Sequence, residues 1–76
     1  MANIGIIGAG SWGSALGNLL AEAGHGVRIW DIDKGIIADI RDNGRNSRYL
    51  PGVELSGKLK TAGTDEEAVS GADIAL

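Results

Sequence analysis

Apolar and polar positions along the chain fall into blocks that each have the length of one strand or one helix. Residues 3–8 form a short, isoleucine-rich run without polar alternation, which is typical of a strand covered on both faces. The run VRIWD at residues 27–31 predicts a second strand that ends on a carboxylate. Residues 59–62 predict a short third strand, and residues 73–76 the start of a fourth.

Helical spacing separates these strands. The first predicted helix covers residues 12–23, and Gly24 can end it in a left-handed conformation. Its aliphatic residues recur at spacings of three and four, so we expect one buried stripe on the sheet. That stripe comprises Leu16, Leu19, Leu20 and Ala23.

Two further helices are marked by their capping residues. Asp33 can cap a helix that ends at Gly44. The expected buried positions of this helix are Ile36, Ile37 and Ile40. Thr64 and Glu67 form a capping box that opens a third helix running through Ser70.

The resulting order, βαβαβαβ, predicts an α/β fold with a Rossmann-type parallel sheet and right-handed crossovers. We expect residues 1–76 to form the N-terminal part of a dinucleotide-binding domain. The only long irregular segment, residues 43–58, lies where a functional loop could be.

The six residues GAGSWG follow the first predicted strand and open the first helix, so they match G-x-G-x-x-G in the context that dinucleotide binding requires. Gly8 would allow the tight turn, Gly10 would leave room for a pyrophosphate, and Gly13 would let the helix pack closely on the strand. The backbone N–H groups of Ser11, Trp12 and Gly13 would point at the phosphates.

A carboxylate strengthens this prediction. Asp31 lies 21 residues beyond Gly10, where an acidic residue accepts hydrogen bonds from an adenosine ribose. A carboxylate there would repel a 2′-phosphate, which predicts NAD rather than NADP. Trp12 is expected either in the core or over the cofactor, Trp30 in sheet packing, and His25 in a surface turn.

Composition and charge exclude several other classes of protein. The 76 residues allow one small domain, and the net charge of −3 without a basic block indicates neither nucleic acid nor an anionic membrane as a partner. The chain has no cysteine and one histidine, which argues against disulfides and a metal site. It has no charged leader and no apolar run of about 18 residues. We therefore expect a cytoplasmic protein.

Two long stretches of the chain resemble the N-terminal part of NAD(P)-dependent glycerol-3-phosphate dehydrogenases. They are IGIIGAGSWGSALGNLLAEAGHGVRIW at residues 4–30 and NSRYLPGVELSGKLKTAGTDEEAVSGADIAL at residues 46–76. The specific marks are GAGSWG, Trp30 at the end of the second strand, RYLPG and GADIAL. The resemblance covers essentially the whole chain.

This resemblance implies reversible hydride transfer between a nicotinamide dinucleotide and dihydroxyacetone phosphate, which supplies sn-glycerol 3-phosphate for glycerophospholipids. It implies that Ser11 and Trp12 touch the dinucleotide at the phosphate loop and that Tyr49 approaches it from the long loop. Positions 32 and 33, often basic in bacterial members, would lie near the adenosine ribose. Here they are Ile32 and Asp33, which again favours NAD over NADP.

The family's catalytic lysine and helical substrate domain lie beyond residue 76, so we expect no catalytic residue and no activity in these 76 residues alone. Two alternatives stay open at this stage. One is another Rossmann dehydrogenase, of the 6-phosphogluconate or ketopantoate reductase type. The other is a nucleotide-binding module without catalysis. The open edge of the last strand also predicts self-association, and hence a homo-oligomer, or disorder of the C-terminus.

Overall fold

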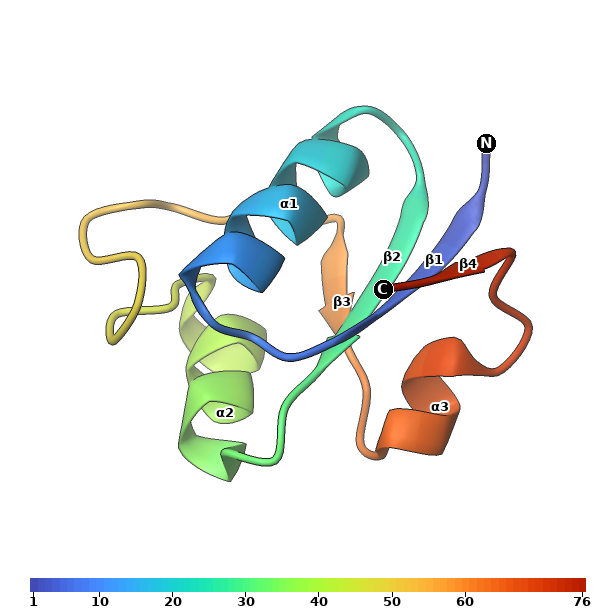
Figure 1. Ribbon diagram of the computed structural model, residues 1–76. Helices are drawn as coiled ribbons and strands as arrows, with labels where there is room; N and C mark the ends of the chain where they lie inside the picture. The colour runs from blue at the N-terminus through green and yellow to red at the C-terminus, as the bar shows by residue number, and fades with distance from the viewer.

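The computed structural model describes residues 1–76. It contains a four-stranded parallel sheet with helices on both faces (Figure 1). The strands are β1 (Asn3–Ile7), β2 (Gly26–Trp30), β3 (Leu59–Thr61) and β4 (Ile74–Ala75). The helices are α1 (Ser11–Glu22), α2 (Lys34–Asn43) and α3 (Asp65–Val69). The predicted Rossmann-type α/β fold is therefore confirmed. None of the three helices has both the length and the apolar character needed to cross a membrane.

The strand order β3-β2-β1-β4 places β1 in the middle of the sheet. Figure 1 shows α1 and α2 on one face and α3 on the other. The chain therefore leaves β1 toward β2 on one side and returns from β3 to β4 on the opposite side. Sheets of this kind form a crevice at the carboxyl ends of their strands, where the strand order reverses.

The core lies between the sheet and the α1–α2 layer. Alternate residues of β1 and β2 point into it, and α2 contributes its three predicted isoleucines, which are all buried. This confirms the predicted stripe of α2. The largest members of the core cluster are Ile4, Ile6, Val27, Ile29, Ile36, Ile37, Ile40, Leu55 and Leu59.

The predicted stripe of α1 is wrong. Leu19 is 65% exposed and Ala23 faces solvent, while Leu16 and Leu20 are only half-buried. The face that packs on the sheet carries small residues, namely Gly13, Ser14, Gly17 and Ala21. A Cβ atom at Gly17 would lie 3.1 Å from the Ile6 Cδ1 atom, so small side chains let α1 approach the sheet more closely than a leucine stripe would.

The caps of α2 and α3 are those expected. The Asp33 carboxylate accepts from the backbone N–H of Gly35 at 2.9 Å, and Gly44 ends α2 with φ +66°. Thr64 Oγ1 accepts from the Glu67 N–H at 3.0 Å. The Glu67 carboxylate in turn accepts from the N–H of Gly63 at 3.3 Å, one residue before the position a capping box predicts.

Candidate functional site

The glycine-rich turn joins β1 to α1 at the carboxyl edge of the sheet. Gly8 has φ +114°, and its N–H donates to the Trp30 carbonyl oxygen at 2.7 Å. A Cβ atom at Gly13 would lie 2.2 Å from the Gly8 carbonyl oxygen, so no other residue fits without displacing the backbone. These two glycines thus allow the tight turn and the close contact between helix and strand that the motif predicts.

The N-terminus of α1 faces open space. Gly10 is the N-cap residue and offers no side-chain acceptor, and the first turn contains no acidic residue. A Cβ atom at Gly10 would meet no other atom within 4 Å. The N–H groups of the first turn, from Ser11, Trp12 and Gly13, are therefore uncapped by any side chain. Together with the positive end of the helix dipole they fit an anionic group such as a phosphate.

Asp31 directly follows β2 and lies beside this turn. One carboxylate oxygen accepts from the Ala9 N–H at 2.7 Å, and the other accepts from the Asp33 N–H at 2.8 Å. Asp31 therefore holds the glycine-rich turn in place, a contact that the sequence did not predict. Each carboxylate oxygen has a second lone pair, so Asp31 keeps the capacity to accept a further hydrogen bond.

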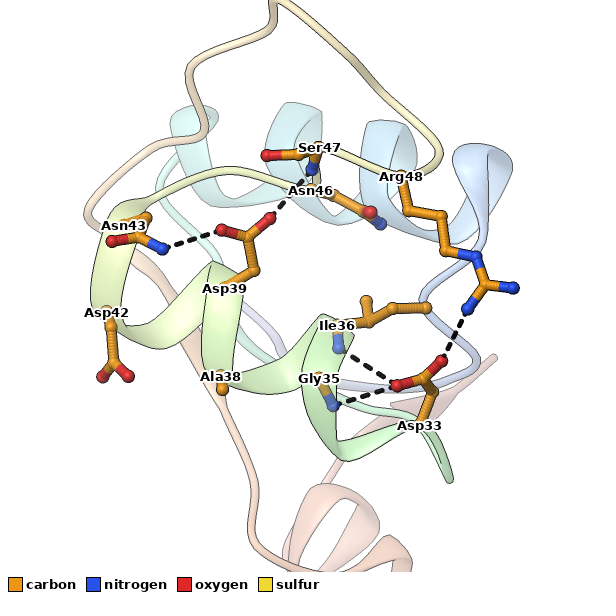
Figure 2. Close-up of a pocket in the computed structure, with 10 residues that line it drawn as sticks. All are labelled: Asp33, Gly35, Ile36, Ala38, Asp39, Asp42, Asn43, Asn46, Ser47 and Arg48. Carbon is orange, nitrogen blue, oxygen red and sulfur yellow. Dashed lines mark hydrogen bonds and ion pairs between the residues drawn. The ribbon is translucent and has the colours of Figure 1, made fainter.

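The two positions after Asp31 differ in their contacts. Ile32 is 84% exposed, whereas Asp33 caps α2 and pairs with Arg48. The Arg48 Nη1 atom lies 2.9 Å from an Asp33 oxygen (Figure 2). The sequence has no arginine at positions 31–33, yet the loop after α2 brings one to this place. Exposed ion pairs of this kind contribute little to stability, but Arg48 offsets part of the local negative charge.

The aromatic candidates are found on the surface. Trp12 is 72% exposed, which eliminates the core alternative. Tyr49 is 43% exposed and lies beneath the Arg48 guanidinium, whose carbon is 5.4 Å from the ring centroid. Trp30 is half-buried in β2. His25 lies in the turn before β2, where its Nδ1 accepts from the Ala2 N–H at 3.0 Å.

Asn46 is a site residue that sequence reasoning missed. It is 1% exposed, although it lies in the irregular loop after α2. Its Nδ2 donates to the Ala9 carbonyl oxygen at 2.7 Å and to Ser14 Oγ at 2.9 Å. The partners are 37 and 32 residues away in the sequence, so no local pattern could have identified the contact.

A groove of about 510 Å³ separates α2 from the residues that follow Asn46 (Figure 2). Within α2, Asp39 accepts from the Asn43 amide at 2.8 Å, and across the groove it accepts from the Ser47 N–H at 2.9 Å. The Ser47 N–H, with a smaller effect of the Asn43 amide, lowers the pKa of Asp39. These bonds fix the start of the loop that carries Arg48 and Tyr49.

A second cavity, of about 710 Å³, adjoins the carboxyl ends of β2 and β3. Trp30, Asp31 and Ile32 line one side, and the segment from Thr61 to Glu66 lines the other. Lys34, Ile37, Ala38 and Arg41 of α2 complete the lining, and its apolar side chains offer a surface on which a planar ring can pack. This cavity lies next to the glycine-rich turn because Asp31 contacts both.

Comparison with known families identifies one match over almost the whole chain. The model for the NAD-dependent glycerol-3-phosphate dehydrogenase N-terminus matches residues 3–76. A glycerol-3-phosphate dehydrogenase (NAD(P)+) of Anaeromyxobacter sp. strain K is 45% identical over 71 residues, which is 93% of this chain and 21% of the relative. That of Lactiplantibacillus plantarum is 40% identical over 76 residues, covering 100% of this chain and 22% of the relative.

Two solved structures have a similar fold. The crystal structure of the Coxiella burnetii glycerol-3-phosphate dehydrogenase matches with a TM-score of 0.88 and 35% identity, over 99% of this chain and 23% of that one. The Plasmodium falciparum glycerol-3-phosphate dehydrogenase matches with a TM-score of 0.84 and 25% identity, over 97% and 23%. This chain thus spans about a fifth of the length of its relatives, and none of these matches favours the alternative reductases.

Proposed function

The chain belongs to the NAD-dependent glycerol-3-phosphate dehydrogenase family, and on this premise we propose that it binds the dinucleotide of an oxidoreductase that interconverts dihydroxyacetone phosphate and sn-glycerol 3-phosphate. One observation carries the proposal. Gly10 opens the uncapped N-terminus of α1 to an empty space next to Asp31, so an anionic group can approach the backbone there.

In this proposal the pyrophosphate lies against the glycine-rich turn. The N–H groups of Ser11, Trp12 and Gly13 donate to its oxygens, and Gly10 leaves the room that a side chain would occupy. Gly8 sets the direction of the turn. Trp12 covers the bound group from the solvent side, which accounts for a large aromatic side chain left 72% exposed.

The adenosine lies toward β2 and the long loop. Asp31 accepts hydrogen bonds from the ribose hydroxyls. It uses the lone pairs that are not engaged by the N–H groups of Ala9 and Asp33. Ile32 and Asp33 border the ribose, and Tyr49 approaches from the loop. The cavity beside Trp30 offers a place for the adenine ring.

The residues of this chain bind and orient the cofactor. A bound nicotinamide dinucleotide supplies or accepts the hydride, and we assign no catalytic residue to positions 1–76. We place the substrate-binding part elsewhere in the protein, since the relatives are several times longer. The small phosphorylated substrate, a cytoplasmic location and a homo-oligomeric state belong to the same proposal and rest on family membership.

We further propose that NAD is preferred over NADP. A 2′-phosphate would be repelled by the Asp31 carboxylate, and Ile32 offers it no donor. Arg48 is paired with Asp33 and Arg41 with Asp42, so Lys34 is the unpaired cation that lines the cavity beside Asp31. The preference therefore depends mainly on Asp31 and on the uncharged side chain at position 32.

The proposal is tested by titrating NADH into the purified protein and a Gly10→Val variant. The valine side chain would occupy the space of the pyrophosphate, so we expect at least a hundredfold loss of NADH affinity in calorimetry with an unchanged circular dichroism spectrum. Gly57→Val is the control, because Gly57 is exposed and a Cβ atom there meets nothing within 4 Å. Equal NADH affinity in Gly10→Val and the unmodified protein would contradict the proposal.

A further inference from the structure

Asn46 is the one asparagine side chain that the fold buries. Both its amide nitrogen and its amide oxygen form hydrogen bonds within the protein. Its Nδ2 donates both hydrogens, to the Ala9 carbonyl oxygen at 2.7 Å and to Ser14 Oγ at 2.9 Å. Its Oδ1 accepts from the Tyr49 N–H at 3.2 Å. Among side chains of this length, only asparagine presents two donors and an acceptor at once.

The partner that matters most is Ala9, which is fully buried between Gly8 and Gly10. Its N–H donates to Asp31 at 2.7 Å, and its carbonyl oxygen accepts from Asn46 at 2.7 Å and more weakly from Ser14 Oγ at 3.3 Å. Both polar groups of this residue are therefore held by side chains from other parts of the fold.

These hydrogen bonds restrict the backbone conformations that Gly8 and Gly10 would otherwise allow. Gly8 and Gly10 impose little steric restriction, so an unsupported turn would sample many conformations. Most of these would turn the first N–H groups of α1 away from a common point. Fixing the Ala9 carbonyl removes this freedom before a ligand arrives, and binding then costs less ordering.

Asn46 also holds the loop segment around Tyr49, on the other side of the proposed dinucleotide site. Its contact with the Tyr49 N–H fixes the backbone of a loop that contains no helix or strand. The Leu50 N–H donates to the Asn46 carbonyl oxygen at 2.8 Å, which closes the same turn of the loop. One buried residue thus places the glycine-rich turn and the Tyr49 segment relative to each other.

We propose that Asn46 is a positioning residue for the dinucleotide: by holding the Ala9 carbonyl and the Tyr49 backbone, it pre-organises the phosphate-binding turn. The inference rests on the proposed function, since it assigns the pyrophosphate to that turn. Asn46 itself touches no ligand and acts through Ala9.

The test compares two asparagines that tie the same loop to the rest of the fold. Asn46→Leu keeps a side chain branched at the same atom but removes every donor and acceptor that contacts the turn and the loop. Asn18→Leu is the matched control, because Asn18 Oδ1 accepts from the Ser56 N–H at 2.7 Å and so holds the far end of the loop to α1. Each purified variant is titrated with NADH and ADP by calorimetry, and with adenosine by NMR.

We expect Asn46→Leu to weaken NADH and ADP binding about tenfold and adenosine binding by a clearly smaller factor, because adenosine meets the Tyr49 segment but carries no pyrophosphate. Asn18→Leu should change all three by less than twofold. Equal losses in both variants, or an equal loss for adenosine, would overturn the inference. Failure of the unmodified protein to bind NADH would instead contradict the proposed function.

A second variant covers the case in which Asn46→Leu does not fold. Asn46→Asp keeps the shape and the acceptor for Tyr49, but as a carboxylate it has no proton for Ala9. Protonation restores one donor, so the NADH affinity relative to the unmodified protein should rise severalfold between pH 8 and pH 5.5. A ratio independent of pH would overturn the inference. So would a failure of both variants to fold, since Asn46 would then act on stability alone.

Discussion

The β1–α1–β2 and β3–α3–β4 units are both parallel crossovers, but the first joins neighbouring strands and the second joins the two edge strands of the sheet. In the first, β1 pairs with β2 over five positions, and α1 is a helix of 12 residues. In the second, β4 pairs with β1 over two positions, and α3 has five residues with Ala68 alone buried. Both residues of β4 are exposed.

The turns of the two units also differ in which residues hold them. The turn of the first unit is tied to β2 by Asp31 and to the long loop by Asn46. The turn before α3 is held by local contacts between Thr64, Glu67 and Gly63. The comparison teaches that two βαβ units of one sheet can hold their turns differently, one through side chains distant in the sequence and the other through residues next to the helix.

The largest expected effect comes from adding one methyl group at two glycines of the first unit, Gly13, which faces its own turn, and Gly5, which faces α3 of the second unit. A Cβ atom at Gly13 would lie 2.2 Å from the Gly8 carbonyl oxygen, and one at Gly5 would lie 2.3 Å from the Ala68 carbonyl oxygen. Gly13→Ala must displace α1 and should cost about 3 kcal/mol with loss of NADH binding, whereas α3 can shift and Gly5→Ala should cost about 1 kcal/mol.

Urea denaturation of the two variants measures these losses. Gly57→Ala serves as the control and should stay within about 0.5 kcal/mol of the unmodified protein, since Gly57 is exposed and has open space around it. If Gly5→Ala destabilised the protein as much as Gly13→Ala, the two units would be equally rigid and the comparison would fail.

An effect of intermediate size is expected on cofactor preference, which depends on the proposed contact between Asp31 and the ribose. The unmodified protein should bind NADH about a hundredfold more tightly than NADPH, which corresponds to about 3 kcal/mol of repulsion at Asp31. Ile32→Arg should narrow this ratio about tenfold by adding a partner for the 2′-phosphate. Asp31→Ala combined with Ile32→Arg should narrow or reverse it.

The double variant should also lose NADH affinity, because Asp31 supports the Ala9 N–H at 2.7 Å. Titration of NADH and NADPH against the three proteins separates the two tasks of Asp31. Equal affinity of the unmodified protein for NADH and NADPH would show that Asp31 does not bind the ribose. Its hydrogen bond to the Ala9 N–H would then be its only role.

The smallest effect is expected at the cap of α3. Thr64→Ala removes the acceptor for the Glu67 N–H and should cost about 1 kcal/mol. Because α3 is short and exposed, the loss should appear as faster amide hydrogen exchange in residues 65–69, with exchange in α1 unchanged. Slower or equal exchange in α3, or faster exchange in α1, would show that the two units do not open separately.

Much of the fold could be predicted because its determinants are local. The ends of α2 follow from Asp33 and Gly44, and the start of α3 follows from Thr64. The stripe of α1 was wrong because spacing identifies apolar residues on a helix but not how closely the helix approaches the sheet. Gly13 and Gly17 set the distance between α1 and the sheet, and the leucines of α1 then lie away from the contact face.

The sequence by itself determined the strand–helix order, the glycine-rich turn and the position of a carboxylate 21 residues beyond Gly10. These features depend on neighbouring residues, whose spacing fixes backbone conformation and burial. The tertiary structure alone decided that Asn46 holds the Ala9 carbonyl and that Arg48 pairs with Asp33. Those partners are 37 and 15 residues apart, and only the packing of the long loop against α1 and α2 brings them within hydrogen-bonding distance.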